Sequence, residues 1–239
     1  QWCATGSMAT ARMSHTATML NSGKVLVAGG HYQSSDLATS ELFDPSTGQS
    51  TTTASLATAR SEHTATLLNS GKVLVSGGIS GGGASPIATC EIFDPSTSQW
   101  TNSSSMATAR FFHTATLLNS GKVLVAAGRH ASLTLATCEI FDPSTNQWST
   151  TGSMATARYY HTATLLKSGI VLVTGGNTGS SLIATCEIFD SSTSLWTSTA
   201  NMTIAHSRDP AQLLNSGEVL VAGGQSTSSV VATCEKYCM

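Results

Sequence analysis

The stretch HTATMLNSGKVLVAGG, from His15 to Gly30, is the unit from which this 239-residue chain is built. It recurs with few changes at 63–78, 113–128 and 161–176, and a more divergent copy occupies 209–224. The final glycines of successive copies are 48, 50, 48 and 48 residues apart. A repeat of this length indicates one supersecondary unit that is used five times.

Each repeat predicts four short strands and no helix. The first strand starts at His15, and Asn-Ser-Gly after it forms a tight turn in which glycine adopts positive φ. The second strand, Lys24–Ala28, ends at Gly-Gly, and a loop of variable sequence follows. The third is Ala-Thr-Cys-Glu-Ile-Phe in most copies, closed by an Asp-Pro-Ser-Thr turn, and the fourth begins at Gln-Trp. Four strands per ~45 residues are typical of a propeller blade.

The pattern of an apolar run, Gly-Gly, an aromatic residue and then tryptophan resembles the Kelch repeat. The aromatic residues are Phe43, Phe93, Phe141, Phe189 and Tyr237. Trp100, Trp148 and Trp196 each follow seven residues later, whereas Ser50 stands at this position in the first repeat. The resemblance implies an all-β, five-bladed Kelch-like β-propeller with four antiparallel strands per blade. Residues 1–239 then form one domain, with blades at about 13–55, 61–105, 111–153, 159–201, and 207–239 together with 1–6.

The two ends of the chain predict how the ring closes. The last repeat stops at Tyr237-Cys238-Met239 before a fourth strand, and the chain opens with Gln1-Trp2, which resembles that strand elsewhere. We therefore expect the first residues to complete the fifth blade, because closure removes exposed sheet edges. Cys3 and Cys238 are expected to face each other there and to form a disulfide. The alternative is two free terminal thiols.

Composition and charge exclude some classes of function. Only 10% of the residues are charged and the net charge is −2, so no basic surface favours nucleic acid. The apolar runs are too short for a membrane-spanning helix. Six cysteines and two sequons, at Asn102 and Asn201, favour a secreted glycoprotein whose signal peptide has been removed.

Three sets of repeated residues are predicted to serve the fold. Cys90, Cys138, Cys186 and Cys234 share one strand position and are expected to be small buried residues, because equivalent positions in a ring do not converge on a metal. Histidines His15, His63, His113 and His161 are expected to pack between blades, with a metal- or anion-binding ring as the alternative. Arginines Arg12, Arg60, Arg110 and Arg158 are expected to pair with the repeated glutamates, with a cationic pocket as the alternative.

Residues that break the repeat mark a candidate binding face. In an antiparallel blade the connection before the first strand and the one after Gly-Gly emerge on the same side, and the Kelch resemblance implies ligand binding there. The residues expected to bind are Phe112, Tyr160, Arg129, Glu62, Arg208, His31, Tyr32 and Asn177. Aromatic faces beside hydrogen-bonding groups suit a sugar ring or a peptide side chain.

The predicted function is a secreted, non-enzymatic binding module for a glycan or a protein segment, without a cofactor or metal. The alternative is a self-associating subunit of an extracellular coat or fibre, since discs that stack heterologously form filaments. A galactose-oxidase-like or glycoside-processing enzyme is a distant third. No nucleophile elbow, zinc motif or phosphate loop occurs in the sequence.

Overall fold

A computed structural model describes residues 2–83, 85–226 and 229–238, and these residues are all-β. The predicted five-bladed propeller is confirmed, with one antiparallel sheet for each repeat. The chain forms two compact units, residues 1–111 (unit 1) and 112–239 (unit 2). Each unit contains whole blades, and the single-domain organisation stays a prediction. No helix that could span a membrane occurs in the described residues.

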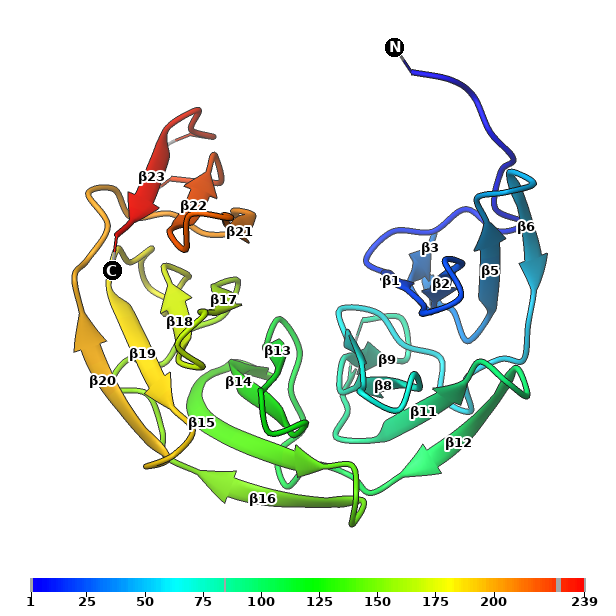
Figure 1. Ribbon diagram of the computed structural model, residues 1–239, viewed down its shortest axis with the longest axis horizontal. Coiled ribbons are helices and arrows are strands. Elements are labelled where there is room, and N and C mark those ends of the chain that lie inside the picture. The colour runs from blue at the N-terminus through cyan, green and yellow to red at the C-terminus, as the bar shows by residue number, and fades with distance from the viewer. Residues whose placement is uncertain (1, 84, 227–228, 239) are drawn as a thin grey trace. The chain divides into compact units, whose positions relative to one another are not determined.

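Unit 1 contains blades one and two, each with four antiparallel strands (Figure 1). Blade one is β1 (Thr16–Met19), β2 (Val25–Ala28), β5 (Ser40–Asp44) and β6 (Gln49–Thr52). Blade two is β7 (Thr64–Leu67), β8 (Val73–Ser76), β11 (Cys90–Asp94) and β12 (Gln99–Ser103). The loop after each Gly-Gly forms a small hairpin, β3 (His31–Tyr32) with β4 (Ser35–Asp36) and β9 (Ile79–Ser80) with β10 (Ser85–Pro86).

Unit 2 contains blades three, four and five. Blade three is β13 (Thr114–Leu117), β14 (Val123–His130), β15 (Leu133–Asp142) and β16 (Gln147–Thr151). Blade four is β17 (Thr162–Leu165), β18 (Val171–Thr174), β19 (Cys186–Asp190) and β20 (Leu195–Thr199). Blade five is β21 (Ala211–Leu213), β22 (Val219–Ala222) and β23 (Cys234–Tyr237), so its described residues provide three strands.

Apolar side chains of neighbouring blades form the core within each unit. In unit 1, Leu26 and Ala28 of blade one pack with Val73 and Phe93 of blade two. In unit 2, Leu124 of blade three packs in one cluster with Val171 and Phe189 of blade four, and a similar cluster joins blades four and five. In blades two, three and four the second strand is therefore buried on both faces along its continuous Val-Leu-Val run.

Strand register bears on the predicted disulfide. In blade two Asp94 is paired with Gln99, and Phe93 with Trp100; blade four repeats this register. By the repeat, Cys238 corresponds to Asp94, and its facing position belongs to Gln1, which lies outside the described residues. Cys3 corresponds to Thr101, two positions further, where diagonal neighbours lie roughly 7–8 Å apart. A disulfide needs Cα atoms within about 6.8 Å.

In the register of the other blades, Cys3 and Cys238 would lie two positions apart rather than directly opposite each other. Both are exposed free thiols in this structure. The disulfide and the completion of blade five by residues 1–6 stay predictions, and the disulfide lacks the geometric support that the sequence interpretation gave it.

Candidate functional site

Buried arginines fix the segment that leads into the first strand in blades one, two and four. Arg60 donates hydrogen bonds to the carbonyl oxygens of Gly77 and Thr89 at 3.0 and 2.7 Å, and to Glu91 Oε1 at 2.8 Å. Glu91 also accepts hydrogen bonds from two backbone amides of this segment. The same clamp joins Arg12 to Glu41 and Arg158 to Glu187. The predicted structural Arg–Glu pairing is confirmed, because these charges are buried and paired.

Two residues after each repeated arginine, and two residues after His206 in blade five, the backbone takes the left-handed conformation. These residues, which we call the ladder residues, have φ of 53–59° and are Ser14, Glu62, Phe112, Tyr160 and Arg208. In unit 1 the amide of Glu62 donates to the carbonyl of Ser14 at 3.1 Å. In unit 2 the amide of Tyr160 donates to Phe112 at 3.2 Å, and that of Arg208 to Tyr160 at 3.0 Å. The ladder therefore joins neighbouring blades within each unit.

The ladder residues of unit 2 form a row of side chains in close contact. The rings of Phe112 and Tyr160 lie 3.9 Å apart between centroids, and Arg208 Cζ lies 3.8 Å from the centroid of Tyr160. Beneath this row, the ring of Tyr159 is 5.1 Å from that of Tyr160, and Arg129 Cζ is 5.0 Å from the Tyr159 centroid. The structure thus brings together four of the predicted binding residues, in a row of aromatic and guanidinium planes.

Asn177 borders this row through its backbone. Its amide and carbonyl groups are hydrogen-bonded to those of Tyr159 at 2.8 and 3.0 Å. The Asn177 side chain accepts a hydrogen bond from the Gly179 amide at 2.7 Å, so it shapes its own loop.

The loop of blade one organises the predicted residues of unit 1. His31 Nδ1 lies 3.1 Å from Asp36 Oδ1, and the Ser61 hydroxyl donates to the same carboxylate at 2.6 Å. The amides of Gly82 and Gly83 donate to the other Asp36 oxygen. Ladder residue Glu62 accepts a hydrogen bond from Ser14 at 2.6 Å, and Tyr32 is exposed.

The His31–Asp36 pair predicts a pH dependence. The hydrogen bond to Asp36 raises the pKa of His31 above its ordinary value of 6.5. Its stabilising contribution is therefore fully present below pH 6.5 and is lost as pH rises through the raised pKa. Burial alone would raise the pKa of Asp36, but hydrogen bonds, above all from Ser61 and His31, hold it below its ordinary value. The contribution of Asp36 is accordingly lost at acidic pH, as pH falls through that lowered pKa.

An NMR titration of the His31 ring checks this expectation. We expect Asp36→Asn to shift the His31 midpoint downward toward its ordinary value, whereas Lys24→Ala leaves it unchanged. The same midpoint in the wild type and in Asp36→Asn would contradict the pairing.

The repeated histidines and cysteines serve the packing. His63 Nε2 lies 3.0 Å from the Thr16 hydroxyl, and His161 Nε2 lies 2.9 Å from that of Thr114. Burial lowers the pKa of both imidazoles to about 3. Three of the four repeated cysteines are buried, while Cys234 is exposed. Within the described residues, no group of three or more potential metal-binding side chains comes together.

Sequence reasoning missed two features of this face. Tyr159 is not among the predicted binding residues, and it is the buried support on which Tyr160 and Arg129 lie. The shared left-handed backbone was not predicted, since five different residue types without a single glycine occupy the position. Asp36 is also not among the predicted binding residues, because its contact with Ser61 depends on the loop conformation.

A comparison with known families identifies the family to which the repeats belong. Residues 1–154 match the KLHDC2/KLHL20/DRC7 Kelch-repeats domain, which is more than half of the chain. The chain belongs to the Kelch-repeat family. Membership indicates that this Kelch propeller is a protein-binding module.

Other comparisons bear on the fold alone. No curated protein matches the Kelch chain significantly. Among solved structures, "Structure of YjhT" is similar, with a TM-score of 0.76 and 15% sequence identity. The alignment covers 93% of this chain and 80% of that one.

Proposed function

We propose that this Kelch protein is a non-enzymatic binding module that recognises a protein segment. The segment binds on the surface that carries the ladder residues, which we call the ladder face, chiefly through Phe112, Tyr160 and Arg208. The observation that carries the proposal is the row of close contacts formed by these three side chains. Aromatic and arginine side chains contribute most of the energy in many protein interfaces, because they bury large planes at little entropic cost.

Backbone strain supports the same face. A bulky residue in the left-handed region is an outlier that costs on the order of 1–3 kcal/mol. Phe112, Tyr160 and Arg208 all adopt it, although glycine would adopt it without strain. Strain that the surrounding fold maintains at consecutive blades is a feature of binding and catalytic sites.

The charge of the row favours a peptide over a neutral sugar as the first ligand to test. Arg208 is exposed and lies over the ring of Tyr160, so its guanidinium group has hydrogen-bonding edges available to carbonyl or carboxylate oxygens. A glycan remains the second candidate, because a sugar ring packs on the same aromatic planes.

Selection from a displayed peptide library, followed by binding assays with the best synthetic peptide, tests the proposal. We expect Arg208→Gly to weaken binding about tenfold or more, because the guanidinium is lost. The free energy of unfolding should not fall, because glycine relieves the backbone strain at this position. Lys122→Ala, which removes an exposed lysine paired with Asp142, is the matched control and should bind like the wild type.

Two results would contradict this assignment. One is a selected peptide whose affinity Arg208→Gly leaves unchanged. The other is a chain that selects no peptide but binds an oligosaccharide on a glycan array. This result would favour a glycan as the ligand of the same face.

Secretion and glycosylation are part of the proposal. Asn102 and Asn201 are both exposed, which supports their accessibility to glycosylation. The alternative function is a self-associating subunit of an extracellular coat or fibre.

A further inference from the structure

Blade five holds the segment of its ladder residue with different side chains from the other blades. His206 stands at the position of the repeated arginines, and Asp209 stands at the position of the repeated histidines. The ladder residue Arg208 lies between these two substitutions. Its amide donates to the carbonyl of Tyr160 at 3.0 Å, so the place of Arg208 on the ladder face depends on how this segment is fixed.

His206 and Asp209 form a buried pair of polar side chains. Both side chains are 1% exposed, and His206 Nδ1 lies 3.2 Å from Asp209 Oδ1. Among the described residues, neither ring nitrogen of His206 and neither carboxylate oxygen of Asp209 has a partner in hydrogen-bonding geometry. A buried carboxylate is costly unless a charge or a donor compensates it, so the charge of the imidazole matters at this position.

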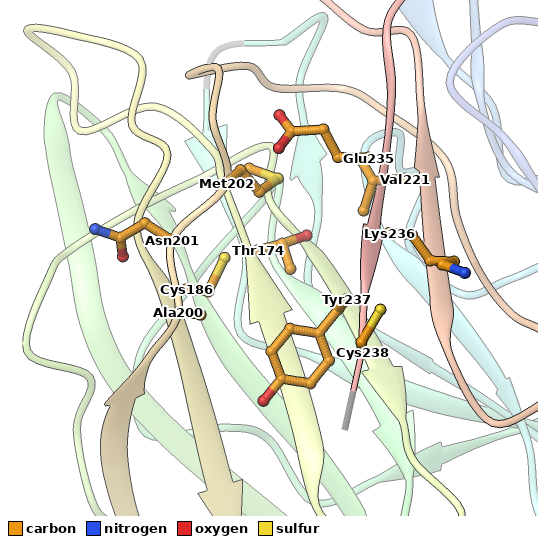
Figure 2. Close-up of a pocket in the computed structure, with 10 residues that line it drawn as sticks. All are labelled: Thr174, Cys186, Ala200, Asn201, Met202, Val221, Glu235, Lys236, Tyr237 and Cys238. Atoms are coloured by element: carbon orange, nitrogen blue, oxygen red, sulfur yellow. The ribbon is translucent and has the colours of Figure 1, made fainter.

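Glu235 of β23 faces the same imidazole. Its Oε1 lies 3.7 Å from His206 Nε2, and it accepts hydrogen bonds from the amides of Thr203 and Ile204 at 2.6 and 3.0 Å. Figure 2 shows its side chain directed toward Met202, which precedes these two amides. Burial alone would raise the pKa of Glu235, but hydrogen bonds, above all from the two amides, hold it below its ordinary value. The imidazole therefore lies between two carboxylates.

Blade four shows the usual charges at the same two positions. Arg158 is a cation at every ordinary pH, and it donates to Glu187 and to two carbonyl oxygens. His161 is uncharged near neutral pH, because burial lowers its pKa to about 3. In blade five, by contrast, one imidazole faces two carboxylates, and imidazoles ordinarily change charge between pH 5 and 8.

We propose that His206 is a positioning residue for Arg208: its imidazolium bridges Asp209 and Glu235, fixes the segment between them, and strengthens ligand binding through Arg208 as pH falls from 8 to 5.5. The protonated ring has an N–H on each nitrogen and donates to both carboxylates. The neutral ring has one N–H, so one carboxylate loses its donor and a buried negative charge is left uncompensated. This inference rests on the proposed function, because Arg208 is one of its three binding residues.

The neighbouring groups of unit 2 keep their charges over this pH range. Burial raises the pKa of the Cys186 thiol, which interacts with Glu235, so the thiol stays uncharged. The other charges on these elements are Arg208 on the ladder and two ion pairs, Arg158 with Glu187 and Lys236 with Glu218. A change in this segment between pH 5.5 and 8 is therefore assigned to His206.

Hydrogen exchange in the ligand-free full chain, followed by NMR, is the first test. We expect the protection factor of the Arg208 amide, corrected for the intrinsic effect of pH, to fall about fivefold or more from pH 5.5 to pH 8. The amide of Tyr160 is the matched control. It bonds to the carbonyl of Phe112, but Arg158 holds its segment, so its protection should stay constant. A constant ratio of the two protection factors would overturn the proposal.

The second measurement is the affinity of a selected peptide without histidine at the same two pH values. The wild type and Lys122→Ala should bind about fivefold or more tightly at pH 5.5, and His206→Gln should lose this difference. The double variant His206→Arg with Asp209→His restores the residues of blade four, so it should bind equally well at both pH values. A wild-type pH dependence in His206→Gln or in the double variant would overturn the role of His206. A chain that binds no peptide would contradict the proposed function, whereas hydrogen exchange still decides whether His206 fixes the segment.

Discussion

Replacing Arg158 with leucine is expected to lower the free energy of unfolding by about 3–5 kcal/mol. Arg158 is fully buried and donates hydrogen bonds to the carbonyls of Gly175 and Thr185 and to Glu187 Oε1, at 2.6–2.9 Å. Its removal leaves the Glu187 carboxylate without its cationic partner in a site with little water. It also leaves two carbonyl groups without this donor. Urea denaturation followed by fluorescence or circular dichroism measures the loss.

Lys122→Ala is the control for this experiment. Lys122 pairs with Asp142 at 3.0 Å, but its side chain is 47% exposed, so we expect a loss of less than about 1 kcal/mol. The same small loss of unfolding free energy in both variants would contradict the structural role assigned to the Arg158–Glu187 pair.

Blade five differs from the other blades, because His206 replaces the arginine and lies 3.7 Å from Glu235.

Gly78→Ala is expected to cost at least about 2 kcal/mol, the second largest effect on stability. Gly78 has a φ of +104°, and an added Cβ would lie 2.5 Å from the carbonyl oxygen of Ser61 and 2.9 Å from His63 Cβ. The backbone of the ladder-face segment must move to accept the methyl group. The midpoint of urea denaturation reports the change.

Gly23→Ala separates backbone strain from this steric clash. Gly23 also has a positive φ, +82°, but nothing lies within 4 Å of an added Cβ. We expect a loss of about 1 kcal/mol from conformation alone. Equal losses in the two variants would show that contact with the segment of Ser61 does not constrain the second glycine of Gly-Gly.

The repeat predicts the fold well because each local signal is physical. The Asn-Ser-Gly turn places a glycine where φ is positive, and the Val-Leu-Val run requires burial on both faces. Register was harder to predict, because it depends on how the Asp-Pro-Ser-Thr turn closes. That turn pairs Asp94 with Gln99, which displaces the predicted partner of Cys238 by two positions.

The contacts among the proposed binding residues were predicted in part. Non-repeated residues at one position identified Phe112, Tyr160 and Arg208, which the structure places in close contact in a row. The left-handed backbone beneath them and the His31–Asp36–Ser61 contact depend on loop conformations that vary from blade to blade. Periodicity contains no information about such loops, so the sequence could place these residues on one side of a blade but not in contact.

The affinity of a selected peptide for Tyr160→Ala, measured beside the unfolding free energy of the same variant, tests the binding face most directly. Tyr160 contacts both Phe112 and Arg208, so its removal leaves neither side chain with its ring contact in the row. We predict binding at least tenfold weaker than that of the wild type, in a chain that still unfolds cooperatively. Unchanged affinity in a folded Tyr160→Ala chain would contradict the assignment of the ladder face as the partner site.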